Sequence, residues 1–512
     1  MNKPLKKGGR DLFVLVIGNA VLYLAAIVTL KVSTSVLSPA EMGRMSLILA
    51  VLLWFNVIFG GISSYVQRNL LAWDSFGLAS KYVLRLILFM FIVSIAGGAG
   101  VAVLSNLVDI GAGAGPFWLG GIVFGFLFLI GLNTAFTGWF NLFRRRFRFM
   151  LFSNITVWGC LAVSALFCVW FGPSAESWLL GQILWNAFVL IASWFLIFGI
   201  FSTAQTVQEG APNAGEVPSE SFSAILRFVW PISVASLLLW TQQSAYRFAL
   251  EGIAGLEVVG LFTVGFGLGM NFINRFEILF NQFYHPIFFS EIITNDAGKR
   301  AQAWNDYAYY LIPSSVLLSL YIILGGPFIA KLFVGDEFFR VAKDVIAWGV
   351  LSQLILVMMT MYSMAGIIER ETSKFIMPNV AGVLAMLAGF FFLSGRDPYF
   401  VAGFSLCAGG AVSLAVMRLK MKQLLPVRFP AKRLAFALIL SLPMVGFLAI
   451  ARGLCASPGL GTALLVLVIS GTYMLALQGL LAGKRFSLAE KISGLSRLES
   501  YLDSLYARVG GA

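Results

Sequence analysis

Long apolar runs, separated by short polar segments, recur from one end of the chain to the other. Each run holds about 20 residues, and a helix of that length, rising about 1.5 Å per residue, crosses a hydrocarbon core of about 30 Å. The pattern predicts an all-α polytopic membrane protein with about fourteen transmembrane helices and no sizeable soluble domain. The predicted spans are 12–34, 45–67, 82–106, 116–140, 149–171, 177–200, 224–247, 258–283, 304–326, 342–367, 374–394, 398–418, 433–451 and 461–482.

The composition supports this interpretation. Of the 512 residues, 59% are apolar and 12% are charged, whereas soluble domains carry about 25% charged residues. The mean hydropathy is +0.88. Because so few charged residues cannot cover a water-exposed surface, soluble enzymes and nucleic-acid-binding modules are excluded, and no nucleic-acid partner is expected.

The net charge of +13 has a different meaning in a membrane protein. Basic residues in short loops fix the orientation of the helices, because cytoplasmic loops hold an excess of Lys and Arg. If the N-terminus is inside, most of the 36 Lys and Arg residues fall in cytoplasmic segments. The sequence therefore predicts that both termini are cytoplasmic.

Two features divide the chain into parts. The longest polar interruption, 202–222, is rich in Pro, Gly, Ser and Glu and predicts a flexible cytoplasmic linker. Glu41 and Gly43 open one span, and Glu257 and Gly260 open another, which indicates a duplicated unit. The predicted parts are an N-terminal six-helix lobe at 1–201, the linker, a C-terminal six-helix lobe at 223–422, a terminal helix pair at 423–483 and an amphipathic cytoplasmic tail at 484–512.

A second repeated spacing supports the prediction of a duplicated unit. Arg145 precedes Asn154 by the same spacing by which Arg370 precedes Asn379. Because the equivalent helices start from the same side of the membrane, the two lobes are predicted to be parallel repeats about an axis along the membrane normal. Transporters use such repeats to build a cleft between two lobes.

Polar side chains on otherwise apolar helices are the candidate functional residues. Such groups are costly inside a bilayer and usually line a cavity or meet a partner. A cavity between the lobes is one interpretation; the other is that Arg275 pairs with Glu277 or a carbonyl group, while the amides hold helices together. The candidate substrate-binding residues are Asn271, Asn274 and Arg275 on the predicted helix 8, Gln243 and Arg247 on helix 7, and Asn56 and Arg68 on helix 2.

Metal, cofactor and catalytic chemistry find little support. The four cysteines lie far apart with no C-x-x-C pair, and His285 is the single histidine. We expect no metal site, no cofactor and no catalytic residues. His285 is interpreted as a satisfied residue at the membrane interface.

Several other residues have structural interpretations. The glycine run 265–269 has the wrong spacing for a dinucleotide loop and predicts close helix contact or bending. Trp118 and Trp139 bracket helix 4 and are predicted to anchor it at both interfaces. Snorkelling or a role in topology is at least as well supported as a site role for four basic residues that lie near predicted interfaces, namely Lys31, Arg44, Arg68 and Arg247.

Four stretches resemble bacterial polysaccharide flippases of the multidrug/oligosaccharidyl-lipid/polysaccharide exporter superfamily. VLSPAEMGRMSLILAV (Val36–Val51) and YVQRNLL (Tyr65–Leu71) resemble their helix 1–2 region. SAYRFALEGIAGLEVVGLFTVGFGL (Ser244–Leu268) and FYHPIFF (Phe283–Phe289) resemble their helix 7–8 region. An acidic residue often precedes the helix 7 arginine in such proteins, and Tyr246 stands there in this chain, which weakens an analogy in ion coupling.

The resemblance implies a non-enzymatic transporter of the bacterial inner membrane. It would move an undecaprenyl-diphosphate-linked oligosaccharide from the cytoplasmic to the periplasmic leaflet by alternating access. Arg247 and Arg275 would then contact the pyrophosphate, since a guanidinium is well suited to phosphate oxygens. Membrane lipids, a glycan polymerase and export proteins are the partners that this implies.

Two alternatives stay open. A multidrug or cation antiporter of the same superfamily would favour buried carboxylates on helices 1 and 7, and neither predicted span holds one. A membrane polysaccharide polymerase or ligase would need a large outer loop for a sugar polymer, and the predicted outer segments are short.

Overall fold

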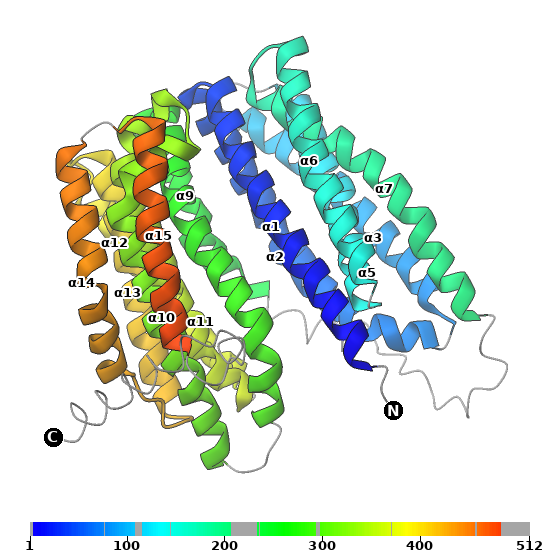
Figure 1. Cartoon of the computed structure of the whole chain (residues 1–512). Helices are drawn as coiled ribbons and strands as arrows, with labels where there is room; N and C mark the ends of the chain where they lie inside the picture. Colours follow the sequence, from blue (N-terminus) through cyan, green and yellow to red (C-terminus); the bar gives the residue numbers. More distant parts are fainter. Residues whose placement is uncertain are drawn as a thin grey trace. The chain divides into compact units, whose positions relative to one another are not determined.

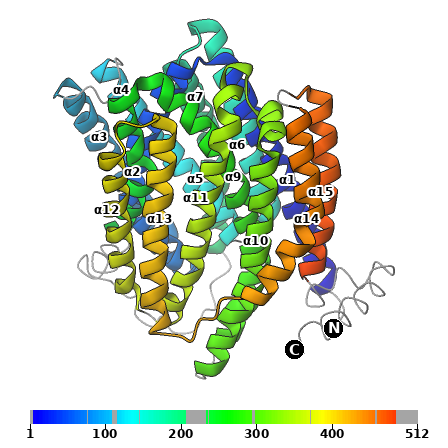
Figure 2. The same cartoon turned by 90° about the vertical axis from the view of Figure 1, so that its left-hand side faces the viewer.

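The computed structural model describes residues 4–75, 77–107, 115–143, 145–205, 233–234, 236–292, 297–369, 371–455 and 458–482. These residues form helices joined by short turns, with no β-strand among them. Figures 1 and 2 show the helices from two sides. The chain divides into two compact units, which are described separately.

The first unit comprises 1–263 together with 333–338 and 393–402. Within it α1 packs against α6, α3 against α4, and α7 against α2, α5 and α6. Its helices are α1 (Pro4–Val36), α2 (Pro39–Ser75), α3 (Ala79–Leu107), α4 (Pro116–Gly125), the π-helix η1 (Phe126–Ile130), α5 (Gly131–Leu142), α6 (Arg146–Phe171), α7 (Ala175–Gln205), the π-helix η2 (Thr241–Ala245) and the first part of α9 (Tyr246–Ile292).

The second unit comprises 264–332, 339–392 and 403–512. It holds the rest of α9 and the helices that follow. These are α10 (Ala297–Phe333), α11 (Asp336–Ile368), the short 3-10 helix η3 (Thr372–Phe375), α12 (Ile376–Phe392), α13 (Pro398–Lys422), α14 (Ala431–Leu454) and α15 (Leu460–Ala482).

The predicted fold class is confirmed, and the protein is a multi-pass membrane protein. Twelve segments among the described residues are long and apolar enough to cross a membrane. Most helices extend past the predicted spans, because their polar ends continue beyond the apolar core, whereas α12 is shorter than the predicted span 374–394. Residues 202–205 of the predicted linker belong to α7, and the rest of that linker and the predicted tail at 484–512 lie outside the described residues. The lobe boundaries stay a prediction.

One break in α9 separates the two spans predicted at 224–247 and 258–283. Gly255 has a φ angle of +81° and a ψ angle of 175° inside the helical run. A residue with a Cβ rarely adopts that conformation, so glycine allows the chain to turn there without a longer loop. The helix before Gly255 and the helix after it therefore correspond to helices 7 and 8 of the prediction.

Aromatic side chains fill the centre of the first unit. Phe136, Trp139 and Phe140 of α5 are buried with Leu132 and Phe152. Trp139 is only 1% exposed. The prediction that it anchors the helix at a lipid interface is wrong, because its side chain lies on the protein-facing side of α5.

Glycines bring α9 and α11 into close contact in the second unit. A Cβ added to Gly265 would lie 2.8 Å from the Cα atom of Ala342, and one added to Gly269 would lie 2.9 Å from the backbone nitrogen of Val350. The space around Gly267 is open. The prediction of close helix contact is confirmed for the two glycines that lie one turn apart.

The terminal helices α14 and α15 lie side by side and pack on α10 (Figure 2). The buried guanidinium of Arg433 donates a hydrogen bond to the carbonyl oxygen of Leu481. Its Cζ atom lies 3.7 Å from the ring centroid of Tyr309 and 4.5 Å from that of Tyr310. Gln478 donates to the carbonyl oxygen of Ser314 over 2.8 Å. These contacts join the two helices to each other and to α10 near the start of α14 and the end of α15.

Two pairs of residues that the sequence predicts to be equivalent make similar contacts. Asn154 in α6 and Asn379 in α12 each donate to the carbonyl oxygen four residues earlier, over 2.8 and 2.9 Å. Gly43 and Gly260 contact each other in the first unit. The repeat itself stays a prediction.

Candidate substrate-binding site

A π-helical turn precedes Arg247 and sets the direction of the side chains around it. The five residues of η2 follow the helical residues 236–240 and lead directly into α9. Its extra residue in one turn shifts the following side chains around the helix, and such turns are frequent at functional sites. Gln242 and Ser244 are buried there, and Gln243 is half-buried. Trp240 donates to the carbonyl oxygen of Ala50 over 2.9 Å, which holds this turn against α2.

Arg247 is the predicted site residue with the most unusual surroundings. Its Nε and Nη1 atoms are buried and have no hydrogen-bond acceptor among the described residues. The contact that its guanidinium does make is to Tyr246, a neutral phenol, through a side-chain hydrogen bond. A buried cation without an anion is costly, and a bound anion would remove much of that cost.

The predicted residues of helix 8 lie in the second unit. Asn271 and Arg275 have exposed side chains one turn apart on α9, and Asn274 is half-buried. Asn271 donates to the carbonyl oxygen of Gly267 in its own helix over 2.8 Å. Asn271 and Arg275 therefore lie on one face of α9, and their role in a substrate cavity stays a prediction.

Glu277 was treated in the sequence only as a partner for Arg275, and the structure gives it different surroundings. Its side chain is hydrogen-bonded to that of Gln353 on α11. Glu277 is 9% exposed, whereas Arg275 is exposed. Side chains two positions apart in an α-helix are rotated by about 200° around its axis, so Arg275 and Glu277 point in nearly opposite directions. This angle follows from the sequence, and it could have indicated that the two side chains have different surroundings.

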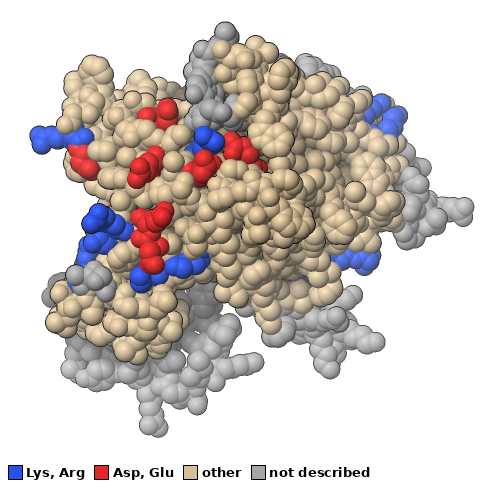
Figure 3. Space-filling view, turned by 90° about the horizontal axis from the view of Figure 1, so that it is seen from above, with Lys and Arg blue, Asp and Glu red and all other residues tan. Residues whose placement is uncertain are grey.

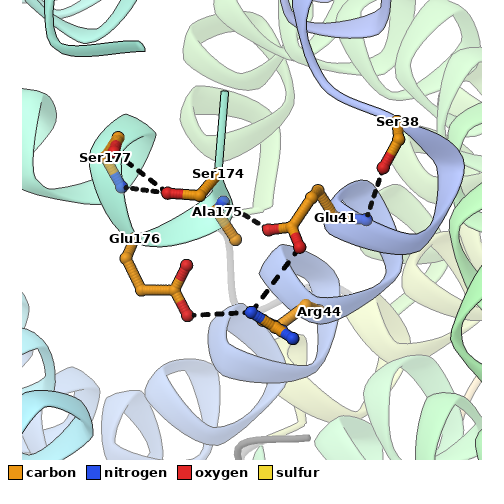
Figure 4. Close-up of polar contacts among 7 residues, drawn as sticks. All are labelled: Ser38, Glu41, Arg44, Ser174, Ala175, Glu176 and Ser177. Carbon is orange, nitrogen blue, oxygen red and sulfur yellow. Dashed lines mark hydrogen bonds and ion pairs between the residues drawn. The ribbon is translucent and has the colours of Figure 1, made fainter. Parts of the chain in front are cut away.

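Arg44 belongs to an ion-pair cluster between α2 and α7 (Figure 4). Its Nη1 atom lies 3.2 Å from Glu176 and 3.5 Å from Glu41. Glu41 also accepts a hydrogen bond of 2.8 Å from the backbone N–H of Ala175, the first residue of α7. The carboxylate therefore stabilises the positive end of that helix. Arg44 is a structural residue of the first unit.

Lys31 also has a structural partner. It donates to the carbonyl oxygen of Val334, and Gly335 donates its N–H to Thr34 over 2.9 Å. The end of α1 is thus joined to the connection between α10 and α11 within the first unit.

Seen from above, acidic and basic side chains lie near one another on a mostly uncharged face (Figure 3).

Some predicted residues cannot be placed. Asn56 and Arg68 belong to α2 and His285 to α9, but their side chains lie outside the described residues. Among the residues that are described, no group of three His, Cys, Asp or Glu side chains could hold a metal ion.

The fold matches those of solved membrane transporters. A structure titled lipid II flippase MurJ, inward closed conformation, aligns with a TM-score of 0.63 and 13% identity over 91% of this chain and 98% of that chain. An inward-facing multidrug resistance MATE family transporter of the MOP superfamily aligns with a TM-score of 0.54 and 16% identity, over 81% and 97%. An outward-facing MATE family transporter of the MOP superfamily aligns with a TM-score of 0.52 and 18% identity, over 80% of this chain and 93% of that chain.

This chain has the fold of these membrane transporters. The resemblance seen in the sequence is therefore confirmed at the level of fold. No protein-family model and no curated protein sequence matches the chain. At identities below 20%, the comparisons give the architecture, and the residues of this chain must supply the argument for substrate.

Proposed function

We propose that the protein flips an undecaprenyl-diphosphate-linked oligosaccharide from the cytoplasmic to the periplasmic leaflet of the bacterial inner membrane by alternating access. Both termini are cytoplasmic in this proposal, in keeping with the distribution of basic loops. Membrane lipids surround the protein, and a glycan polymerase and export proteins act on the product.

The observation that carries the proposal is the state of Arg247. Two of its nitrogen atoms are buried and lack an acceptor among the described residues. A pyrophosphate offers several anionic oxygens to such donors, and guanidinium groups bind them bidentately. The fold similarity to a lipid II flippase supports a lipid-linked substrate.

Arg275 is the second proposed contact. It lies on the inner half of the predicted helix 8, whereas Arg247 lies on the outer half of helix 7, so the two would meet the pyrophosphate at different stages. Asn271, Asn274 and Gln243 would add hydrogen bonds to the head group. Asn56 and Arg68 of α2 complete the proposed set.

The alternative of a multidrug or cation antiporter has one observation in its favour. Glu277 is a buried carboxyl group within the membrane-spanning helices, and buried carboxylates suit cationic substrates or coupling ions. It packs against Gln353, inside the second unit. A buried arginine without an anionic partner, such as Arg247, would repel the substrate of a cation exporter, so the flippase is favoured. A membrane polymerase or ligase is less favoured, since the predicted outer segments are too short to hold a sugar-polymer site.

The test is flipping of a fluorescent undecaprenyl-diphosphate-linked sugar in vesicles that hold the purified full chain. Arg247→Ala and Arg275→Ala should each slow flipping by roughly 10- to 100-fold, since a hydrogen bond to a charged group contributes about 1.5–3 kcal/mol. Lys should retain more activity than Ala at either position, because it keeps the charge but loses the fork. Unchanged flipping in both alanine variants would refute the pyrophosphate contact, and export of a lipophilic cation instead would favour the alternative.

A further inference from the structure

Tyr246 is held in a fixed position beside Arg247 at the start of α9. It is 1% exposed, and its ring meets the ring of Phe262 edge-on, with centroids 5.7 Å apart. Phe262 follows the break at Gly255, so the second part of α9 packs back on the first within the first unit. Tyr246 therefore cannot turn away from Arg247 without disturbing both parts of the helix.

The contact to Arg247 leaves the guanidinium charge in place. The Cζ atom of Arg247 lies 5.5 Å from the ring centroid of Tyr246, and a side-chain hydrogen bond joins the two residues. Arginine can only donate, so the phenol oxygen accepts. A phenol orients the guanidinium and adds a cation–π attraction, but it brings no negative charge.

Other described side chains do not supply that charge. Glu251 lies one helical turn beyond Arg247 on α9. The ion pairs found among the described residues include no pair between Glu251 and Arg247. The Nε and Nη1 atoms of Arg247 are buried without an acceptor there. The cation is thus oriented by a neutral neighbour and remains available to a ligand.

We propose that Tyr246 determines the charge preference of the site, since it holds Arg247 in position as a neutral partner and leaves the positive charge for an anionic head group. A carboxylate at position 246 would form an ion pair at the same place and cancel that charge. The inference rests on the proposed function, in which Arg247 contacts pyrophosphate, and it makes Tyr246 a positioning residue that selects anions over cations.

The first experiment measures binding of geranylgeranyl diphosphate, a short polyprenyl diphosphate without a sugar, to the full chain in lipid nanodiscs. Tyr246→Phe keeps a neutral ring and loses one hydrogen bond, so affinity should fall by less than about tenfold. Tyr246→Glu should weaken binding by roughly 100-fold or more, as buried charge pairs couple strongly. Equal affinity in the wild type and Tyr246→Glu would overturn the proposal.

A second probe covers the case in which Tyr246→Glu folds poorly. The double variant Tyr246→Glu/Arg247→Gln leaves a carboxylate in place of the cation, and it should bind tetraphenylphosphonium, a lipophilic cation, at least tenfold more tightly than the wild type does. Binding that saturates at one cation per protein distinguishes this site from uptake by lipid or by the exposed apolar surface of a misfolded protein, and no gain in saturable binding would overturn the proposal. Tyr246→Gln gives an independent measure, because a neutral hydrogen-bonding residue should hold diphosphate affinity within about tenfold; a loss as large as that of Arg247→Gln would overturn the proposal.

The two proposals fail in different ways. If the wild type binds the diphosphate and the Tyr246 variants behave as stated, but vesicles show no flipping, the proposed transport function is wrong and the charge preference stands. If the wild type flips the lipid-linked sugar while Tyr246→Glu binds and flips as well as the wild type, the function stands and the assignment of Tyr246 is wrong. If the wild type does not bind the diphosphate, both are wrong.

Discussion

The close contact between Gly43 and Gly260 in the first unit can be tested by adding a methyl group at either position. A Cβ added at Gly43 would lie 2.9 Å from the carbonyl carbon of Leu256, and one added at Gly260 would lie 2.8 Å from that of Pro39. In both cases the carbonyl oxygen is closer still. Pro39 and Leu256 each stand four residues before a contacting glycine, so the two halves make the same contact in opposite directions.

The size of the effect follows from these distances. The nearest atoms are the carbonyl oxygens, at 2.0 Å from the Cβ added at Gly43 and 1.8 Å from the one added at Gly260. Carbon and oxygen atoms in contact lie about 3.3–3.6 Å apart, so a methyl group would force the backbones apart by roughly 1.3–1.8 Å. Main-chain atoms cannot rotate away, so we expect the upper part of the usual overpacking cost of about 1–3 kcal/mol. Alanine regains up to about 1 kcal/mol of helix propensity. Gly43→Ala and Gly260→Ala should therefore each lower stability by about 2 kcal/mol.

Gly267→Ala is the matched control, because it lies in the same helix as Gly260 and has open space around it. It should raise stability by up to about 1 kcal/mol. The measurement is thermal unfolding of the purified protein in detergent, followed by circular dichroism and tryptophan fluorescence. Once one methyl group has separated the helices the second meets less resistance, so the double variant should lose clearly less than the sum of the two single losses. Stabilisation at position 43 or 260, or full additivity, would refute the reciprocal contact.

Three further predictions concern polar contacts and are checked by the same unfolding measurement. Arg44→Ala leaves two neighbouring carboxylates without their shared cation, and it should lower stability by about 1–2 kcal/mol. In 0.5 M salt the difference between the wild type and the variant should be smaller, because salt screens the ion pairs of the wild type. Arg433→Ala removes a buried cation from two tyrosine rings and should cost about 2 kcal/mol, whereas Arg452→Ala, in an exposed ion pair, should change stability by less than about 0.5 kcal/mol. Glu277→Gln keeps a hydrogen-bonding group and removes a desolvated charge, so its stability at pH 8 should equal or exceed that of the wild type; marked destabilisation would contradict that interpretation.

The sequence predicts the architecture well because span length and apolar composition follow directly from the thickness of a bilayer. The predicted repeat drew attention to Gly43 and Gly260, and these two glycines contact each other. Helix ends were less accurate, because α-helices continue through polar residues once they leave the apolar core. Trp139 shows a second limit: an aromatic residue near a helix end suits an interface or a packed core equally, and only the neighbouring helices decide.

The candidate site could be predicted only in part, since which arginine is available for a ligand depends on long-range pairing. The chain has 36 basic and 23 acidic residues, so many cations must remain without a carboxylate. In the described residues, carboxylates pair with Arg44, Arg300 and Arg452, while Tyr246 faces Arg247. Arg44 and Arg247 look alike in sequence, since each is an arginine near the end of a predicted span. The neighbouring group differs, because Arg44 pairs with carboxylates and Arg247 contacts a phenol. That difference is the reason we propose Arg247, and not Arg44, as the arginine that binds an anion.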